Sequence, residues 1–159
     1  MRSTLAALAL TAVLVGASPA RAIGFTADAG GGVWLLEATQ FDFHVRIDQK
    51  LFVDWLHIGV RPGLALTLNE PNPRLAIPLD ALVRLKMFFV YLDFFGGIYW
   101  IPSHLDSVRS HLGGGVGVKI WRLEIGFEVS YLNPSAVLMG RVGFNIWDSS
   151  SEKKAESEK

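Results

Sequence analysis

Hydrophobic and polar residues alternate along much of the chain with a period of two, the pattern of a β-strand with one apolar face. Residues 56–68 show it clearly: large aliphatic side chains recur at every second position, and Arg61 lies among the small and polar residues between them. The aliphatic positions assigned to one shared face include Ile58, Val60, Leu64 and Leu66. Alternation alone does not say whether that face points into a protein core or outward to lipid.

Similar alternation predicts eight strands. They are residues 27–38, 41–50, 55–68, 74–87, 89–101, 109–121, 122–132 and 136–147. Most contain about 10 to 14 residues, whereas a strand averages about 5 to 6 in a soluble domain and needs about 9 to 11 to span a membrane at a tilt. Length therefore favours an all-β fold, an eight-stranded antiparallel up-and-down transmembrane β-barrel. The first strand is the weakest prediction, because GGGVWLLEA does not alternate clearly.

The connections fit an up-and-down order. Residues 69–74, 101–109 and 133–135 are rich in residue types that favour turns. Between them the chain reverses at DQKLFVD, near KMFF and at WR. If the N-terminus starts on the periplasmic side, counting strands places the turn-rich group at one rim and most of the tighter reversals at the other.

The face opposite the aliphatic residues indicates which side meets lipid. It is rich in glycine, as at Gly59, Gly63, Gly113 and Gly117, and glycine weakens a strand unless space is tight. The interior of an eight-stranded barrel is just wide enough for side chains, so small residues there make room for large charged ones. We therefore expect the aliphatic face to contact lipid and the charged face to fill the interior, without a diffusion pore.

Buried charges need partners, and the simplest hairpin registers supply them. We expect cross-strand ion pairs between Arg84 and Asp93, Lys119 and Glu124, and Glu128 and Arg141. Other charged residues expected inside are Arg61, Asp80, Arg46 and Asp42. The signs of the charges assigned to the interior balance.

The length of the aromatic segment FFVYLDFFGGIYW predicts the height of the apolar band. Phe89 to Trp100 spans about 36 Å at about 3.3 Å per residue, or about 28 Å vertically at a tilt near 40°. That height suits a membrane band with aromatic residues at both rims. The residues expected in these aromatic girdles are Phe88, Phe89, Tyr99 and Trp100.

The N-terminus has the features of a secretory signal peptide. Arg2 precedes an apolar run, and Ala20-Arg21-Ala22 offers an A-x-A cleavage site. We expect residues 1–22 to be cleaved, residues 23–147 to form the barrel, and residues 148–159 to be a disordered charged periplasmic tail. The predicted location is the cell outer membrane, reached by export through the inner membrane.

Composition narrows the classes of partner. The chain has no cysteine, which excludes a disulfide framework. Without Arg2 and Arg21 it carries 13 basic and 15 acidic residues, so no strong positive field attracts nucleic acid. No stretch after residue 22 is long and apolar enough for a membrane helix. The expected partners are outer-membrane lipid and, during insertion, the barrel-assembly machinery; no cofactor is expected, and the oligomeric state stays open.

In strand number and length, residues 23–147 resemble the small eight-stranded outer-membrane barrels of Gram-negative bacteria, such as OmpX-like proteins and the OmpA-type transmembrane domain. The resemblance lies in pattern rather than in a motif. It implies an integral outer-membrane protein with a structural or surface-interacting role, not a general porin. The chain departs from such barrels in the residues that follow Trp147, and in Pro62 and Pro78, where we expect local bulges.

A lipid-modifying enzyme is an alternative, because some eight-stranded outer-membrane barrels are such enzymes. The segment 103–111 holds residue types of a nucleophile, a base and an orienting group. These residues are Ser103, His104, Asp106, Ser107, Ser110 and His111. Their spacing fixes no catalytic arrangement, so no catalytic residue is assigned, and the two histidines lack a third ligand at metal-binding spacing.

A second alternative is a secreted, soluble lipocalin-like ligand-binding barrel. Gly32-Val33-Trp34 is similar to the Gly-x-Trp of lipocalins. Lipocalins also carry a helix after the eighth strand, whereas here only a polar tail follows Trp147.

Overall fold

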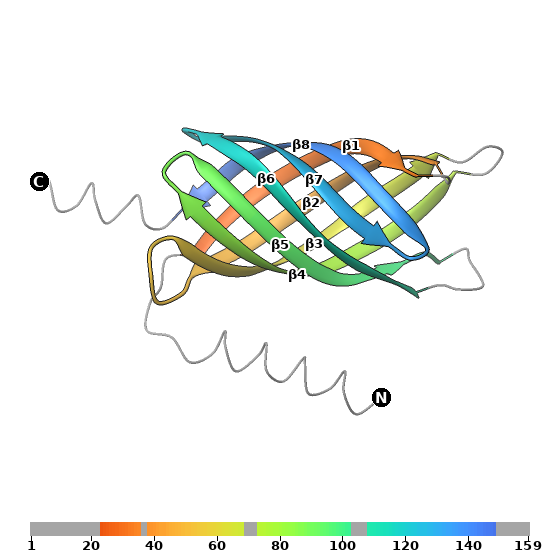
Figure 1. The fold of residues 1–159 in the computed structure, drawn as a ribbon, viewed down its shortest axis with the longest axis horizontal. Helices are drawn as coiled ribbons and strands as arrows, with labels where there is room; N and C mark the ends of the chain where they lie inside the picture. Colours follow the sequence, from red (N-terminus) through yellow and green to blue (C-terminus); the bar gives the residue numbers. More distant parts are fainter. Residues whose placement is uncertain (1–22, 36–37, 69–72, 103–107, 149–159) are drawn as a thin grey trace, which may run out of the picture.

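The computed structural model describes residues 23–35, 38–68, 73–102 and 108–148. The strands are β1 (Ile23–Trp34), β2 (Ala38–Lys50), β3 (Leu56–Leu68), β4 (Arg74–Met87), β5 (Val90–Trp100), β6 (Val108–Ile120), β7 (Leu123–Leu132) and β8 (Ser135–Asp148). Each pairs antiparallel with its neighbours in sequence, and β1 pairs with β8, so the sheet closes (Figure 1). The predicted eight-stranded antiparallel up-and-down β-barrel is confirmed. Over the same ranges, no helix could cross a membrane.

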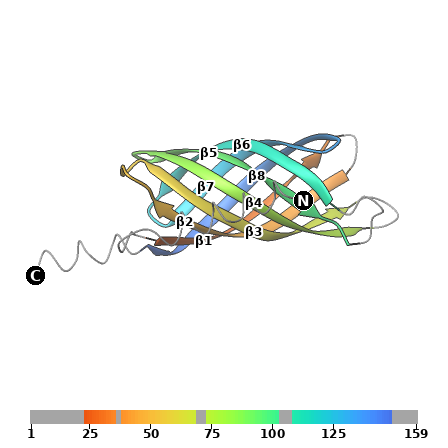
Figure 2. The same ribbon diagram turned by 90° about the horizontal axis from the view of Figure 1, so that it is seen from below.

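The strands run obliquely around the barrel (Figures 1 and 2). The two ends of the barrel differ in the connections that they carry. At one end lie the start of β1, the end of β8 and the reversals at residues 51–55, 88–89 and 121–122. We call this the turn end. The opposite end, where β1, β3, β5 and β7 end and β2, β4, β6 and β8 begin, is the loop end.

Strand β1 departs most from its predicted position. It runs from Ile23 to Trp34, not over residues 27–38, so that prediction is wrong. Pairing on both sides sets its true position, because Ile23 is the register partner of Gln49 on β2 and Trp34 is the partner of Val137 on β8. The other seven strands lie within a few residues of their predicted bounds.

The expected bulges at the two strand prolines are absent from the described ladders. On β3 and β4, Arg61 pairs with Asp80 before Pro62 and Ala65 pairs with Ala76 after it, in one unbroken register. Pro78 likewise keeps register with β5. A proline removes one donor without adding a residue, so the register continues past it. A register shift occurs instead where Phe25 and Thr26 meet β8.

Alternation divides the barrel wall into an apolar outer face and a mostly polar inner face. On β3, Leu64 is 51% exposed whereas Arg61 is 2% exposed. Other exposed outer-face side chains are Phe41, Phe43, Leu66, Leu79, Val83, Phe94, Ile125, Phe127, Val129, Val142 and Phe144. The protein therefore has its apolar residues outside and its charges inside, the reverse of a soluble barrel.

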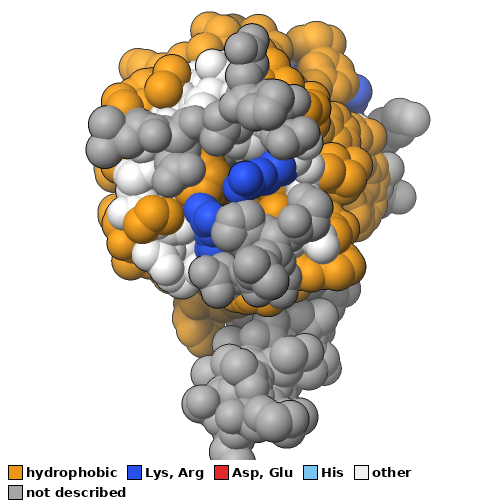
Figure 3. All heavy atoms as spheres, turned by 90° about the vertical axis from the view of Figure 1, so that its right-hand side faces the viewer, with side chains coloured by type: hydrophobic (Ala, Val, Ile, Leu, Met, Phe, Trp, Pro, Cys, Tyr) orange, Lys and Arg blue, Asp and Glu red, His pale blue; other side chains and the backbone are white. Residues whose placement is uncertain are grey.

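The interior near the loop end contains a group of apolar side chains, while the half-buried Arg74 and Arg109 also face inward there. Figure 3 looks onto this end and shows cationic side chains in its mouth. A buried cluster there, which we call the apolar cap, contains Trp34, Ala65, Ala76, Tyr99, Ile101, Leu132, Val137 and Met139. Its members come from the loop-end parts of several strands, together with Ile101 just beyond β5. The cap thus covers the charged part of the interior on the loop side.

Candidate functional site

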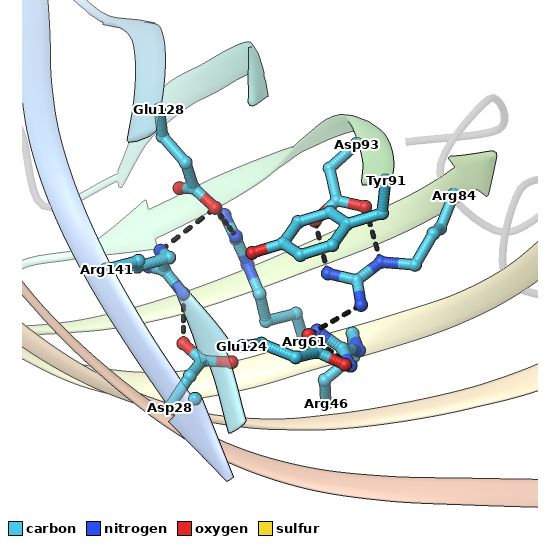
Figure 4. A pocket seen from close by; sticks show the side chains of 10 residues that line it. Asp28, Arg46, Arg61, Arg84, Tyr91, Asp93, Glu124, Glu128 and Arg141 are labelled. Atoms are coloured by element: carbon cyan, nitrogen blue, oxygen red, sulfur yellow. Dashed lines mark hydrogen bonds and ion pairs between the residues drawn. The ribbon is translucent and has the colours of Figure 1, made fainter. Parts of the chain in front are cut away.

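The site is a network of charged side chains in the middle of the barrel (Figure 4). Among the described residues, seven buried carboxylates surround four buried arginines. They are Asp28, Asp42, Asp48, Asp80, Asp93, Glu124 and Glu128, with Arg46, Arg61, Arg84 and Arg141. Of the ten charged residues whose signs were expected to balance, nine are buried and Lys119 is half-buried. Asp28 and Asp48 are two further buried carboxylates that the prediction did not include.

Glu124 on β7 joins two arginines from different strands. Its carboxylate accepts hydrogen bonds from Arg46 at 3.0 Å and from Arg84 at 2.7 Å. Arg84 also binds Asp93 through two contacts of 2.6 Å, and Arg46 donates to Asp48 at 3.1 Å. The interactions from β2 and β4 to β7 cross the lumen, so they tie together strands that are not neighbours in the sheet.

Glu128, two inward positions beyond Glu124 on β7, joins the other two arginines. Arg61 donates to it at 2.7 Å, and Nε of Arg141 lies 2.9 Å from the same carboxylate. Arg61 also contacts Asp80 at 3.1 Å, and Arg141 contacts Asp28 on β1. Strand β7 therefore carries the two carboxylates on which the network converges (Figure 4).

Aromatic rings and glycines fit around the arginines. The Arg84 guanidinium lies 3.9 Å from the centroid of the Tyr91 ring, and that of Arg61 lies 4.1 Å from the Phe95 ring. A Cβ at Gly117 would approach the Tyr91 hydroxyl oxygen to 2.3 Å. Glycine therefore provides the space in which large side chains stack, as the sequence pattern indicated.

A smaller polar group lies toward the turn end. His57 Nδ1 is 2.9 Å from Asp48 and 3.2 Å from the ammonium nitrogen of Lys86. Both His57 and Lys86 are half-buried. This group extends the charged network to the turn-end mouth, where Asp48 is shared with Arg46.

Several charged residues that were predicted to lie inside the barrel form ion pairs with one another. Arg84 and Asp93 are register partners and form a bidentate ion pair, and Arg61 and Asp80 also pair. Lys119 is the register partner of Glu124, but the Glu124 carboxylate is engaged by Arg46 and Arg84.

The register expected between β7 and β8 is wrong. Glu128 faces Met139, and Arg141 faces Gly126. The predicted pairing of Glu128 with Arg141 requires Leu132 to face Val137, with four residues between them, whereas Leu132 faces Ser135 and only Asn133 and Pro134 join the strands. The Arg141 side chain nevertheless reaches Glu128 diagonally, so the ion pair itself is present.

Most residues that were predicted to lie on the outer face or in the aromatic girdles do face outward. Leu64 and Leu66 are exposed, and Ile58 and Val60 are half-buried at alternate positions of the same strand. Phe88, Phe89 and Trp100 are exposed. Tyr99 is 3% exposed and its hydroxyl accepts from Gln40 at 3.3 Å, so its assignment to an outer girdle is wrong. It shares the inward parity of Asp93 and Phe95 on β5.

The network leaves almost no free space. Its central cavity measures about 10 Å³, which is room for about one water molecule. Within the described ranges, no three His, Cys, Asp or Glu residues form a group that could hold a metal ion. The arrangement binds strands to one another and offers neither a solute path nor a lipocalin-like ligand cavity at this level of the barrel.

The residues considered for catalysis do not form one site where they are described. Ser110 is exposed on β6, whereas His111 is buried and its Nδ1 lies 2.8 Å from Asp80 inside the barrel. Adjacent strand residues point to opposite faces, so this serine and histidine are separated by the barrel wall. Ser103, His104, Asp106 and Ser107 lie outside the described residues.

No protein-family model and no curated protein matches the sequence. Solved structures match its fold. A de novo designed transmembrane β-barrel aligns with TM-score 0.55 and 10% identity over 81% of this chain and 98% of that one. A second designed barrel, solved by solution NMR, aligns with TM-score 0.54 and 13% identity. That match covers 83% of this chain and 98% of the designed one.

The natural outer membrane protein Ail of Yersinia pestis, whose backbone structure was determined in a phospholipid bilayer nanodisc, aligns with TM-score 0.50 and 13% identity. The match covers 77% of this chain and 99% of Ail. At these identities the likeness concerns the fold alone. The chain has the fold of small eight-stranded outer-membrane barrels, as its strand pattern predicted.

Proposed function

We propose that this chain is an integral β-barrel protein of a bacterial outer membrane, with a structural or surface-interacting role. One observation carries the proposal: the outer face of the barrel is apolar while its inner face holds a buried charged network. Water would solvate the charges and not the exposed leucines and phenylalanines, so this distribution suits a lipid solvent. Export by the N-terminal signal peptide would bring the chain to that membrane.

The filled interior argues against a general porin. Porins with an open aqueous channel have about 16 to 18 strands, whereas about eight strands enclose only side chains. Here the arginine–carboxylate network and the apolar cap occupy the lumen. The chain therefore acts through its wall and its ends rather than by conducting solutes.

The two alternatives receive less support. A lipocalin-like barrel needs an apolar cavity, whereas Trp34 of the Gly-x-Trp stretch lies in a packed cluster. A lipid-modifying site needs a nucleophile beside its base, whereas Ser110 and His111 point to opposite faces. We favour the non-catalytic outer-membrane barrel.

Expression in a Gram-negative host tests this proposal. We expect the protein in the outer-membrane fraction, with its first residue at Ile23, and with gel mobility that changes on boiling because the closed sheet resists detergent. Vesicles containing it should not release small solutes faster than empty vesicles. Recovery in the soluble periplasmic extract would contradict the proposal, and rapid solute release would contradict the closed interior.

A further inference from the structure

Two arginines at the loop end differ from the four arginines of the buried network. Arg74 on β4 and Arg109 on β6 are half-buried. Each network arginine contacts at least two carboxylates, whereas Arg74 and Arg109 contact none over the ranges that the structure describes. A guanidinium that is partly removed from water and has no carboxylate beside it favours a bound anion.

Both arginines face the lumen rather than the surrounding lipid. On β4, Arg74 has the same inward parity as Ala76 and Asp80, and on β6 Arg109 has that of His111. Figure 3 looks into the loop-end mouth, where Lys and Arg side chains gather and no Asp or Glu side chain of a described residue is in view. The mouth is therefore positively charged over the part of the chain that the structure describes.

The apolar cap lies next to these arginines, between them and most of the network. Ala76, the next inward residue after Arg74, belongs to the cap, as do Trp34 and Tyr99. The Arg109 guanidinium lies 4.9 Å from the centroid of the Trp34 ring, which belongs to β1 and not to a strand adjacent to β6. Arginine stacked on an aromatic ring keeps its charge and its donors. The cap thus positions Arg109 without neutralising it.

Further hydrogen-bond donors surround the two guanidinium groups. Arg109 donates through Nη1 to the carbonyl oxygen of Asn133 at 3.2 Å, a contact that engages only one of its nitrogens. The indole N–H of Trp34 is buried and has no hydrogen-bond partner among the described residues. Thr67, the register partner of Arg74 on β3, adds a hydroxyl at the same level. Donors from β1, β3, β4 and β6 therefore surround the mouth, and an oxyanion accepts hydrogen bonds from such groups.

The mouth also has room for a ligand. An open hollow of about 440 Å³ lies beside Arg109 and is lined by Val108, Arg109, Asn133 and Pro134. Small-molecule sites commonly measure about 300 to 1,000 Å³. The hollow therefore admits a phosphate or sulfate group together with part of the molecule that carries it.

We propose that the loop-end mouth binds a phosphate or sulfate group of a soluble molecule, with Arg74 and Arg109 as its main contacts. Arginine suits these oxyanions because its planar fork donates two parallel hydrogen bonds. Headgroups of bilayer lipids lie outside the barrel wall, whereas the two arginines face the lumen, so the group enters from the water. This inference rests on the proposed surface-interacting role for the side of the membrane from which the ligand comes.

Isothermal titration calorimetry with inorganic pyrophosphate tests the proposal on the full barrel in phosphatidylcholine nanodiscs. We expect saturable binding, which Arg74→Gln and Arg109→Gln should each weaken by about tenfold or more, because each removes a charged donor. Arg109→Lys keeps the charge and should weaken binding less than Arg109→Gln. Arg122→Gln removes the same charge from an exposed turn-end residue and should leave binding unchanged. Gel mobility before and after boiling checks that each variant is folded.

Three results of this titration would overturn the inference and leave the membrane location untouched. One is equal affinity for all folded variants, or binding that does not saturate. Another is binding that appears only after Glu70→Gln and Asp106→Asn, because these carboxylates, which lie outside the described residues, would then neutralise the arginines. The third is competition by phosphatidic acid in the nanodisc, which would make a lipid headgroup the ligand.

A measurement on cells tests the location separately. The start of β1 and the end of β8 both lie at the turn end, so we expect the loop end to face the outside of the cell. Pyrophosphate linked to a fluorescent dextran too large to cross the outer membrane should label cells that express the original chain. Cells with equal amounts of the Arg74→Gln/Arg109→Gln variant should stay unlabelled. Binding in nanodiscs without labelling of cells would support the anion site and contradict its exposure at the cell surface.

Discussion

Arg84 and Asp93 face each other across the β4–β5 pair inside the barrel, where Nε and Nη2 of the arginine each lie 2.6 Å from a different carboxylate oxygen. Arg84 also donates to Glu124 across the lumen. The pair therefore links a local hairpin contact to the network that crosses the barrel.

Breaking this pair should cost more than removing it entirely. Arg84→Met should lower the free energy of unfolding by about 3 to 5 kcal/mol, because it leaves the buried Asp93 carboxylate without its ion-pair partner. Asp93→Leu should cost less, because Arg84 keeps its contact with Glu124. The double variant should lose less than the two single losses added together. Urea titrations in lipid vesicles would measure the cycle. Lys50 and Asp54 form a matched exposed pair, whose coupling should be below about 1 kcal/mol; additive losses at Arg84 and Asp93 would reject their coupling.

A charge on the outer face should be costly in proportion to its depth. Leu64 lies near the middle of β3 and Leu68 at its loop end, and both are exposed on the outer face. Leu64→Arg should destabilise the barrel in vesicles by about 2 to 4 kcal/mol, and Leu68→Arg by about 0 to 1 kcal/mol. Ala65→Ser, on the inner face beside Leu64, should cost less, because it adds one small hydroxyl and no charge. Equal losses at residues 64 and 65 would contradict the assignment of faces.

The interior should not tolerate a side chain at Gly117. An added Cβ would lie 2.3 Å from the Tyr91 hydroxyl oxygen and 2.6 Å from the Ile125 carbonyl oxygen. Gly117→Ala should therefore destabilise the barrel by about 1 to 3 kcal/mol. At Gly140 the nearest atom to an added Cβ is 3.9 Å away, so Gly140→Ala should be neutral or slightly stabilising. The same unfolding titration checks both variants, and equal effects would speak against tight packing around Tyr91.

Removing candidate nucleophiles should leave the lipids unchanged. Ser110 is separated from His111 by the barrel wall, and the sequence assigns no catalytic spacing to Ser103 or Ser107. Cells that express the Ser103→Ala, Ser107→Ala or Ser110→Ala variant should have the same lipid composition as cells that express the original chain. Mass spectrometry of extracted lipids measures this. A lipid product that depends on one of these serines would establish the enzymatic alternative instead.

Strand number, order and faces could be predicted because most strands contrast an apolar outer face with a charged inner face. Strand β1 lacks that contrast: its inner positions include Gly30 and Gly32, and its outer positions include Ala27 and Ala29. Period-two analysis therefore could not locate its ends. The apolar cap was missed for the same reason, since at Leu132 and Val137 the inner face is apolar like the outer one.

The details of the network depend on distances that a linear sequence does not contain. Hairpin counting relates strands that are adjacent in the sheet, and it found Arg84 with Asp93. It could not reveal that Arg46 and Arg84 share Glu124 across the lumen, or that Arg141 reaches Asp28 on β1. Tyr99 was different. It lies six residues after Asp93, which was expected inside, so parity along the strand was enough to predict that Tyr99 faces inward.

The lipid contact of the outer face can be measured directly on the unaltered protein. The protein is reconstituted into vesicles that contain a lipid with a photoactivatable group near the end of its acyl chain. After irradiation the protein is digested, and mass spectrometry identifies the residues that carry lipid adducts. We expect adducts on outer-face residues such as Leu64, Phe94 and Phe127, and none on Arg61 or Glu128. Adducts confined to inner-face residues, or no adducts in vesicles that retain the folded barrel, would contradict a barrel that faces lipid with its apolar side.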